Sequence, residues 1–491
     1  MRWTLVRVAE ALGVPPPPSG DPMARLAGVS IDSRTVGKGE LFLAVRGPRH
    51  DGHSFVGDAL ARGAAAGVVA RDRFTEYPPE VRTRLLAVDD TLRALREMAR
   101  KYCADWREAK PGRKVAAVTG SAGKTTTKEI LAALLATRFC VLKSEGNLNN
   151  EFGLPLTLLR LGDQHDAAAV ELGMSRRGEL ARLAEIARPD VGVVTNVAPV
   201  HLEFFSSVDE IALAKRELIE GLRGRDPVAV LNADDPRVSK FAEIFQGRVH
   251  YFGSSKNAQF RAENIESRGI DGSVFDFVGP AGRARLELSL VGGHNIINAV
   301  AALAAASEWG IGAADAKQVL RKLLPASLRG EIVRFADGFV VINDCYNSNP
   351  LALERMIDLL CATPGYRRRI LVAGAWREIG SASGELHRAA GKSAVEKKAI
   401  DWILGVDGDA RELVEGAIGA GHPRERTRFF GSAEEAAEFL PEFVTPGDLL
   451  LLKGSRGVHM ETILEAIEAK HPRIRANAGP ESLEAHRRGR D

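Results

Sequence analysis

The chain has 491 residues, of which 45% are hydrophobic and 27% charged, and its formal net charge is +3. These proportions are typical of a globular protein, and so small a net charge gives no support for nucleic acid as a general partner. At roughly 100–200 residues a domain, the length indicates about three domains.

Targeting signals and disulfides are not expected. No apolar run approaches the roughly 18 residues of a membrane span, which excludes a membrane partner of that kind. Arg2, Arg7 and Glu10 interrupt the first apolar stretch, unlike a signal peptide. The four cysteines form no C-x-x-C pair and are interpreted as reduced thiols. We therefore predict a cytoplasmic protein.

Three blocks are predicted along the chain: residues 1–110, 111–327 and 328–470, followed by a polar, frayed tail at 471–491. The first block breaks at prolines 15–18, includes a short strand at 41–45 and ends in the linker 110–114. In the later blocks, apolar strand-like runs alternate with helical patterns, which favours parallel sheets covered by helices. The runs are 167–172, 191–197, 228–231, 339–342, 370–373, 402–405 and 449–452.

The second block opens with a candidate phosphate-binding loop. An apolar run at 115–119 predicts a buried strand, and a helical pattern follows at 124–135. Backbone N–H groups of such a strand, turn and helix can face an anion, with Lys124 adding a positive charge. The loop is shorter than the common G-x-x-x-x-G-K-[ST], and a chance Gly-Lys-Thr is the alternative. The predicted nucleotide-binding residues are Gly120, Ser121, Ala122, Gly123, Lys124, Thr125 and Thr126.

Two further strand ends carry polar residues. Glu171 ends the run at 167–172, at the edge where doubly wound sheets bind ligands. A carboxylate there suits Mg²⁺, to which Thr125 or Thr126 can add a hydroxyl oxygen. A solvated glutamate is the alternative. Asn196 and His201 follow the next strand at the same edge, although a lone histidine there is more often a loop residue.

Lys215 falls on the apolar side of a predicted helix. Ser207 and Glu210 form a capping box that opens a helix running to about residue 222. The apolar positions are Val208, Ile211, Leu218 and Leu222, and Lys215 lies among them. A cation facing a packed interior is costly unless it is paired or neutralised. The alternative is a lysine that extends to the surface along its aliphatic stem.

With these residues in view, the chain resembles the Mur ligase family, the ATP-dependent ligases that extend the peptide stem of the peptidoglycan precursor. Residues 119–126 match the loop that binds the ATP phosphates in this family. The resemblance implies that Glu171 and His201 bind Mg²⁺ and that Lys215 is carbamylated, so that Lys124, Glu171, His201 and Lys215 are the catalytic set. The pattern at 294–298 matches the family's adenine site and implies contacts from Asn295 and Asn298.

Motifs in the outer blocks extend the resemblance. Ser33, Arg34 and Arg46 lie in motifs similar to those of the uridine-nucleotide domain, and residues 146–151 resemble a substrate loop of the family. The motif at 344–350 is similar to the family's D-S-Y-N-A-N-P. The resemblance implies that Arg329 and Asp344 contact the nucleotide when the domains close. The implied substrate-binding residues are Ser33, Arg34, Arg46, Asn147, Asn149, Asn150, Tyr346 and Asn349.

One segment departs from the family pattern. Relatives read G-D-M-x-E-L-G where this chain has Gly374-Ala375-Trp376-Arg377-Glu378-Ile379-Gly380. Ala375 stands in place of the acid and Trp376 in place of the methionine. Dipeptide contacts inferred from relatives at this segment therefore do not transfer directly to this chain.

The resemblance implies an α/β fold of three domains: a small α/β uridine-nucleotide domain, a central P-loop-type parallel-sheet ATPase domain and a C-terminal Rossmann-like domain. It implies ATP and Mg²⁺ as cofactors, a UDP-N-acetylmuramoyl-tripeptide and D-alanyl-D-alanine as substrates, and a monomer. Two alternatives stay open at this point. One is another ligase of the superfamily, adding diaminopimelate, lysine or glutamate. The other is a nucleotide-gated binding protein that hydrolyses ATP slowly.

Overall fold

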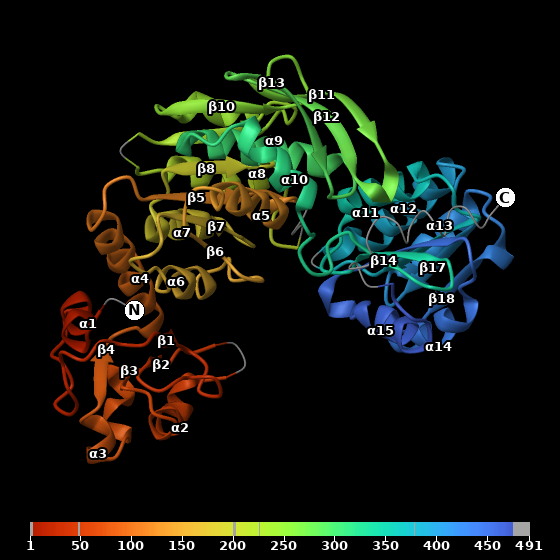
Figure 1. The fold of residues 1–491 in the computed structure, drawn as a ribbon. Coiled ribbons are helices and arrows are strands. Elements are labelled where there is room, and N and C mark those ends of the chain that lie inside the picture. The colour runs from red at the N-terminus through yellow and green to blue at the C-terminus, as the bar shows by residue number, and fades with distance from the viewer. Residues whose placement is uncertain (1–2, 48–49, 200–202, 225, 378, 475–491) are drawn as a thin grey trace. The chain divides into compact units, whose positions relative to one another are not determined.

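A computed structural model describes residues 3–47, 50–199, 203–224, 226–377 and 379–474 (Figure 1). The chain forms two compact units. The first consists of Met1–Val197, Asp209–Arg261 and Val300–Asp315, and the second of Ala198–Val208, Ala262–Ala299 and Ala316–Asp491. The three predicted domains, 1–110, 111–327 and 328–470, stay a prediction.

The first unit opens with a four-stranded parallel sheet in the order β1-β2-β3-β4. Its strands and helices are β1 (Val29–Ser30), β2 (Leu41–Leu43), β3 (Ala66–Ala70), β4 (Leu85–Val88), α1 (Leu5–Leu12), α2 (Val56–Ala61), α3 (Pro79–Arg82) and α4 (Thr91–Glu108). The Asp90 side chain accepts from the Arg93 N–H at 2.9 Å and so caps α4. Tyr102 and Trp106 on α4 are fully buried.

A second parallel sheet of the first unit runs in the order β10-β9-β8-β5-β7-β6. Its strands are β5 (Lys114–Thr119), β6 (Val141–Lys143), β7 (Ala167–Glu171), β8 (Val191–Val194), β9 (Val228–Asn232) and β10 (Arg248–Gly253), and the start of β11 (Phe260–Ser267) pairs with β10. Such near-continuous apolar strands are typical of parallel sheets buried on both faces. The predicted strand 191–197 ends early, because Thr195 and Asn196 turn to contact the loop after β5.

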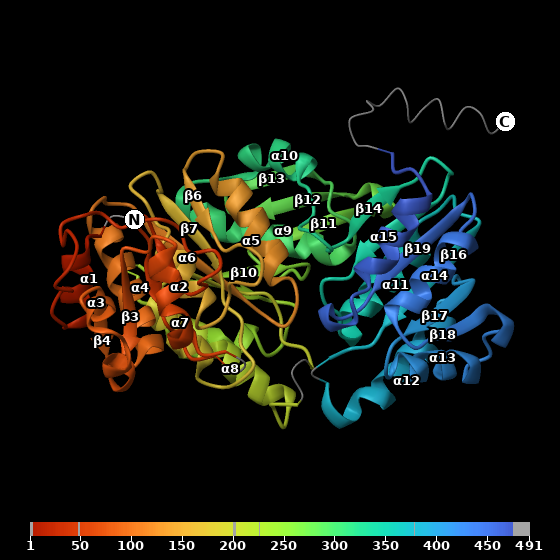
Figure 2. The ribbon, with the colours of Figure 1, turned by 90° about the horizontal axis from the view of Figure 1, so that it is seen from below.

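Helices cover this sheet. They are α5 (Lys124–Leu135), α6 (Gly153–Leu158), α7 (Glu179–Ala187) and α8 (Val208–Glu220). The bounds of α5 are those predicted, and it packs on β5, β6 and β7 (Figure 2). The predicted helix to residue 222 ends at Glu220, but Leu222 is still buried.

The second unit contains an antiparallel pair, β12 (Ser273–Gly279) and β13 (Gly282–Leu288), and a six-stranded sheet in the order β14-β15-β19-β16-β17-β18. Only β14 in the six-stranded sheet is antiparallel to its neighbour. The strands of the six-stranded sheet are β14 (Glu331–Arg334), β15 (Val340–Asp344), β16 (Arg368–Gly374), β17 (Trp402–Val406), β18 (Thr427–Phe430) and β19 (Asp448–Lys453). The four strands predicted here, at 339–342, 370–373, 402–405 and 449–452, are present with ends shifted by one or two residues.

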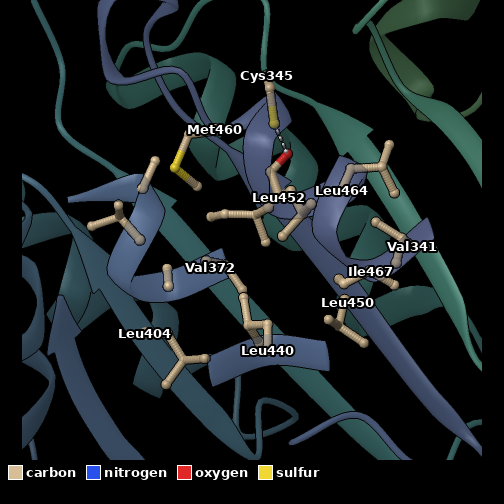
Figure 3. Close-up of a cluster of buried hydrophobic side chains, with 14 of the residues drawn as sticks. Val341, Cys345, Val372, Leu404, Leu440, Leu450, Leu452, Met460, Leu464 and Ile467 are labelled. Carbon is tan, nitrogen blue, oxygen red and sulfur yellow. Dashed lines mark hydrogen bonds between the residues drawn. The ribbon is translucent and has the colours of Figure 1, made fainter. Parts of the chain in front are cut away.

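The core of the second unit lies on both faces of its six-stranded sheet. Side chains of a strand alternate between faces. Leu450 and Leu452 of β19 accordingly pack with Leu440 and Ile467 on one face (Figure 3), while Leu449 and Leu451 pack with other partners on the opposite face. The helices that accompany the sheet are α11 (Pro350–Ala362), α12 (Ser383–Glu396), α13 (Ala410–Gly419), α14 (Ala433–Phe443) and α15 (Glu461–Lys470).

The predicted tail begins in ordered chain. Arg473 bridges to Phe335, and the Ile474 N–H donates to the Arg334 carbonyl at 2.8 Å. The expectation of a frayed segment after Lys470 is therefore wrong for residues 471–474, because they pair with the edge of the sheet. Residues 475–491 lie outside the described residues. Within the described ranges, every helix is too short or too polar to cross a membrane.

We expect Leu451→Ala to lower the free energy of unfolding by about 2–5 kcal/mol, because it deletes a fully buried side chain and leaves a cavity. Urea denaturation followed by circular dichroism measures this. Leu324→Ala is the matched control, since Leu324 is 84% exposed. Equal unfolding midpoints for the two variants would contradict the assignment of Leu451 to the core.

Candidate active site

The candidate site of the first unit lies at the carboxyl ends of three neighbouring strands. β5 lies between β7 and β8. The next strands in the sequence, β6 and β7, lie on one side of β5, and the following strands, β8 and β9, lie on the other side. In open α/β sheets this switch point forms a crevice that binds ligands. The loop after β5, Glu171 at the end of β7 and Thr195 after β8 all belong to this edge.

The turn after β5 is fixed by residues that follow β8. Gly120 has φ +150°, and a Cβ placed on it would lie 1.8 Å from the Oγ1 atom of Thr195, so only glycine fits here. The Thr195 hydroxyl donates to the Ala122 carbonyl at 2.6 Å. The Asn196 side-chain oxygen accepts from the Ala122 N–H at 3.0 Å, and its backbone carbonyl from the Ser121 N–H at 2.9 Å. The loop backbone is thus held in one conformation.

Helix α5 begins directly after this turn. Gly123 stands at its N-cap with φ +83°, and no side chain caps the helix. The first N–H groups of a helix without a side-chain cap carry partial positive charge and suit an anion. Lys124, whose Nζ donates to the Gly120 carbonyl at 3.0 Å, and Thr126 stand in the first turn. The arrangement fits the phosphates of a nucleotide.

Glu171 is a buried carboxylate with neutral partners. It is 3% exposed. The Thr125 hydroxyl donates to Oε2 at 2.6 Å and the Asn149 Nδ2 to Oε1 at 2.8 Å. No ion pair joins Glu171 to another described residue. Burying such a charge without a cation is costly, so the carboxylate and the Thr125 hydroxyl fit a hard divalent cation.

The third predicted metal-binding residue, besides Glu171 and Thr125, is His201. His201 lies outside the described residues. Within the described ranges, no three His, Cys, Asp or Glu side chains gather in a metal-binding cluster. Mg²⁺ usually binds through one or two carboxylates and retained waters, so a site built on Glu171 suits this ion better than an all-protein cage would.

The predicted substrate loop runs from β6 to α6 and carries three asparagines. Asn149 contacts Glu171 through its side chain, and its carbonyl accepts from the Gly173 N–H at 2.8 Å. The Asn150 side-chain oxygen accepts from the N–H of Gly153, the first residue of α6, at 2.9 Å. Asn147 is exposed. The structure therefore brings one of the three side chains to the candidate metal site.

Lys215 is buried, as its place on the apolar stripe predicted. It is 2% exposed on α8, near the buried Ile211 and Leu218 of the same helix. Its side chain does not extend to the surface, which rules out the alternative left open by the spacing. Burial, together with the charge of Lys124, lowers the pKa of the Lys215 amine well below its usual value. Burial therefore favours the neutral form of this amine.

Asp32, next to the predicted Ser33 and Arg34, lines a cavity of about 520 Å³. The other lining residues are 27–31, Thr35, Glu40, Leu156, Leu159 and Arg160. Arg34 is exposed and donates to both carboxylate oxygens of Asp32, at 2.9 and 2.7 Å, which lowers the pKa of Asp32 to about 2. Ser33 is half-buried beside it. Arg46 donates to Asp72 at 2.9 Å. The cavity has polar walls from Asp32 and Glu40 and apolar ones from α6.

The predicted adenine residues of the second unit contact each other. Asn298 Nδ2 donates to Asn295 Oδ1 at 2.9 Å, and Asn295 Nδ2 donates to the Val291 carbonyl at 2.8 Å. Both lie on α9 (Gly293–Ala306) and are buried. Burial, with the charge of Arg355, lowers the pKa of the neighbouring His294 to about 4, so its ring is neutral at pH 7.

The loop after β15 is fixed by a buried lysine. Lys453 Nζ donates to Asp344 Oδ2 at 2.6 Å and to the Asn347 carbonyl at 3.0 Å. The Asn349 side-chain oxygen caps α11 by accepting from Ala352 N–H at 2.9 Å. The Asp344 carboxylate is thus already paired with a cation.

Arg329 and Tyr346 face each other across this loop. The Arg329 guanidinium lies 4.0 Å from the centroid of the Tyr346 ring, and the Tyr346 N–H donates to the Leu328 carbonyl at 3.1 Å. A guanidinium over an aromatic face is an attractive contact. Within the second unit, the structure therefore brings Arg329, Tyr346 and Asp344 to one loop.

Trp376, where relatives have methionine, ties two elements together. Its indole stacks on His387, with ring centroids 4.0 Å apart and an interplanar angle of 26°. Its Nε1–H donates to the Ser348 hydroxyl at 3.0 Å, and its backbone N–H donates to His387 Nε2 at 3.2 Å. The bulky side chain is therefore accommodated, and it holds the loop that carries Tyr346 and Asn349.

Two residues of these networks were not singled out in the sequence. Ser144 accepts from the Glu171 N–H at 3.1 Å through its hydroxyl, and His387 binds Trp376. Ser144 directly follows β6, where polar residues of a parallel sheet gather near ligands, and that position was the available signal. Nothing local in the sequence indicates His387.

Sequence models of the Mur ligase family match three parts of the chain. The Mur ligase family, catalytic domain, matches residues 25–103, the Mur ligase middle domain residues 118–306, and the Mur ligase, glutamate ligase domain, residues 328–456. A curated relative, the UDP-N-acetylmuramoyl-tripeptide–D-alanyl-D-alanine ligase of Bacillus subtilis (strain 168), is 33% identical over 438 residues, which cover 89% of this chain and 92% of the relative.

Solved structures agree with these matches. A crystal structure of MurF from Acinetobacter baumannii is similar, with a TM-score of 0.84 at 29% identity, over 96% of this chain and 99% of that one. A MurF ligase from Thermotoga maritima, in complex with ADP, is similar with a TM-score of 0.77 at 28% identity, over 90% of this chain and 97% of that one.

We expect Trp376→Phe to keep the ring stacked on His387 but to lose the hydrogen bond to Ser348, which is 4% exposed. Leaving that buried hydroxyl without its donor costs about 1–3 kcal/mol of unfolding free energy. A double-mutant cycle with Ser348→Ala, measured by urea denaturation, isolates the interaction free energy between the two side chains. Additive effects of the two substitutions would contradict the contact.

Proposed function

The chain belongs to the Mur ligase family, and we propose that it joins D-alanyl-D-alanine to a UDP-N-acetylmuramoyl-tripeptide with hydrolysis of ATP to ADP and phosphate. The observation that carries the proposal is the sheet edge of the first unit. There an uncapped helix N-terminus, Lys124 and the buried Glu171 face the same switch point. The relatives named for this reaction align over nine-tenths of the chain.

The N-terminus of α5 is the proposed seat of the ATP phosphates. Its N–H groups and Lys124 offset the charge that develops while the terminal phosphoryl group passes to the substrate carboxylate. The Glu171 carboxylate and the Thr125 hydroxyl would hold a Mg²⁺ ion, which would neutralise charge on the phosphate oxygens. The acyl phosphate is then attacked by the amine of the dipeptide, and phosphate leaves from the tetrahedral intermediate. Positioning, rather than covalent chemistry, is the main task of the protein.

The outer motifs are proposed to bind the substrates. Ser33, Arg34 and Arg46 lie in the part of the chain assigned to the uridine nucleotide, and Asn147, Asn149 and Asn150 in the loop assigned to the tripeptide. Asn295, Asn298, Arg329 and Asp344 are proposed nucleotide contacts, and Tyr346 and Asn349 substrate contacts. The protein is proposed to act as a cytoplasmic monomer in the synthesis of cell-wall precursor, because both ATP and UDP-linked precursors are cytoplasmic compounds.

Lys215 is proposed to be carbamylated. The lowered pKa favours the neutral amine, and this form adds to CO₂ through its nitrogen lone pair with release of one proton. The product is an anion that stands beside the positive charge of Lys124. A buried cation is thereby exchanged for a buried anion with a cationic neighbour, which removes the conflict between Lys215 and its surroundings.

Phosphate release with a substrate panel tests the reaction. We expect release only when ATP, a UDP-N-acetylmuramoyl-tripeptide and D-alanyl-D-alanine are all present, and the panel contains tripeptides with diaminopimelate or lysine at the third position. Lys124→Ala lowers turnover on the order of 10²–10³, the usual effect of losing one charge stabiliser. Lys143→Ala is the control, because its half-exposed ammonium contacts Glu129 on the outer side of α5.

Other outcomes of the panel identify other functions. Release without either peptide substrate would indicate a nucleotide-gated binding protein. Release with a UDP-linked dipeptide and diaminopimelate or lysine, or with a folate and glutamate, would indicate a different ligase of the superfamily. Each of these results would overturn the proposal.

We expect Lys215→Ala to be nearly inactive and to regain part of its activity with short carboxylic acids, which occupy the place of the carbamate. In the wild type, ¹³C NMR after equilibration with ¹³C-bicarbonate should show a carbamate signal that is absent from Lys215→Ala. Full activity of the alanine variant, or identical spectra of the two proteins, would contradict carbamylation.

A further inference from the structure

A second lysine of α5 is buried without contact to the phosphate loop. Lys128 is 0% exposed. Its Nζ donates to the Ser144 carbonyl at 2.5 Å and pairs with Glu129 Oε1 at 2.7 Å. Burial of an ammonium group costs roughly several kcal/mol of hydration free energy. Its hydrogen-bond and ion-pair partners have to offset this cost. The position is one turn after Lys124 on the same helix.

The partner of Lys128 is the first residue of the predicted substrate loop. Ser144 follows β6 and is 1% exposed. Its N–H donates to the Ala169 carbonyl at 3.2 Å, and its hydroxyl accepts from the Glu171 N–H at 3.1 Å. The Ser144 carbonyl therefore accepts from the Lys128 ammonium, while the Ser144 hydroxyl accepts from the Glu171 N–H.

From Ser144 the loop returns to Glu171 a second time. Asn149 donates to the Glu171 carboxylate at 2.8 Å and accepts from the Gly173 N–H at 2.8 Å. Close packing keeps this arrangement tight, because a Cβ on Gly153 would lie 2.4 Å from the Cα of Leu148. A shift at the start of the loop would move Asn149 relative to the carboxylate that it orients.

We propose that Lys128 is a positioning residue for the metal site: its ammonium fixes Ser144, and through Ser144 and Asn149 it sets the position of the Glu171 carboxylate for a divalent cation. The inference rests on the metal role of Glu171 in the proposed function. Removal of an outer partner of a metal ligand typically weakens metal affinity about 10–100-fold.

Lys143, which shares its partner Glu129 with Lys128, offers a matched control variant. Lys143 contacts the other oxygen of Glu129, and its side chain is 46% exposed. Lys128→Met and Lys143→Met remove the same charge and the same partner of Glu129. Only the first removes the contact with Ser144. Methionine is unbranched and nearly fills the space of the lysine stem.

The test is binding of Mn²⁺ to the full-length enzyme with bound ADP, measured by the electron paramagnetic resonance signal of free Mn²⁺. No peptide substrate is needed, so a different ligase reaction leaves the readout unchanged. We expect Lys128→Met to weaken Mn²⁺ binding about 10–100-fold and Lys143→Met to leave it within twofold of wild type. A purely stabilising role of Lys128 predicts a lower unfolding temperature with unchanged Mn²⁺ affinity.

Two further variants complete the test. Lys128→Met combined with Asn149→Ala should lose less Mn²⁺ affinity than the two single losses together, since part of the effect of Lys128 passes through Asn149. If Lys128→Met does not fold, Ser144→Ala tests the second step of the path. It keeps the carbonyl that Lys128 binds, removes the hydroxyl that holds the Glu171 N–H, and should weaken binding severalfold. Unchanged affinity in Lys128→Met or in Ser144→Ala, or equal losses in Lys128→Met and Lys143→Met, overturns the proposal. If Glu171→Gln binds Mn²⁺ like wild type, the metal role of Glu171 itself is wrong.

Discussion

The burial of a carboxylate at the end of β7 constrains much of the first unit. Glu171 takes hydrogen bonds from Thr125 and Asn149, which lie on different elements, and its N–H is held by Ser144. Glu171 therefore fixes the relative positions of three elements: α5 after the phosphate loop, the loop after β6, and β7. A parallel sheet makes this possible, because it brings the carboxyl ends of its strands to one edge.

A second constraint comes from the half-buried Lys124 and the buried Lys215. Lys124 and Lys215 are close enough for the charge of the first to lower the pKa of the second, in addition to the effect of burial. Two positive charges at this position are therefore unfavourable. An incoming phosphate at Lys124 and an anionic adduct at Lys215 both relieve this repulsion. The site therefore favours bound negative charge beside Lys215.

Local sequence signals predicted the parts of this site that depend on local chemistry. The bounds of α5 were predicted because glycine at 123 and the change of apolar period mark its start. The spacing of Lys215 to Ile211 and Leu218 placed it on the apolar side of its helix and left a surface-directed side chain as the alternative, which its burial excludes. The contacts of Ser144 with Glu171 and of Trp376 with His387 were not predictable, because they join residues whose separation in space is set by strand order and helix packing. The pairing of Arg473 with Phe335 was missed for the same reason.

In each of the two units, a buried lysine binds a loop that leaves the carboxyl end of a parallel strand. A loop that leaves the carboxyl end of a parallel strand exposes carbonyl groups that no longer belong to the sheet. In the first unit the buried ammonium of Lys128 binds the carbonyl of Ser144, and in the second that of Lys453 binds the carbonyl of Asn347. Each ammonium also has a carboxylate partner, Glu129 or Asp344, which offsets its charge. Lysine suits this task because its three donors reach a carbonyl and a carboxylate at once, on a stem that packs in an apolar interior. Loops held in this way keep their conformation without a ligand, so the binding of substrate does not have to repay the entropy of ordering them.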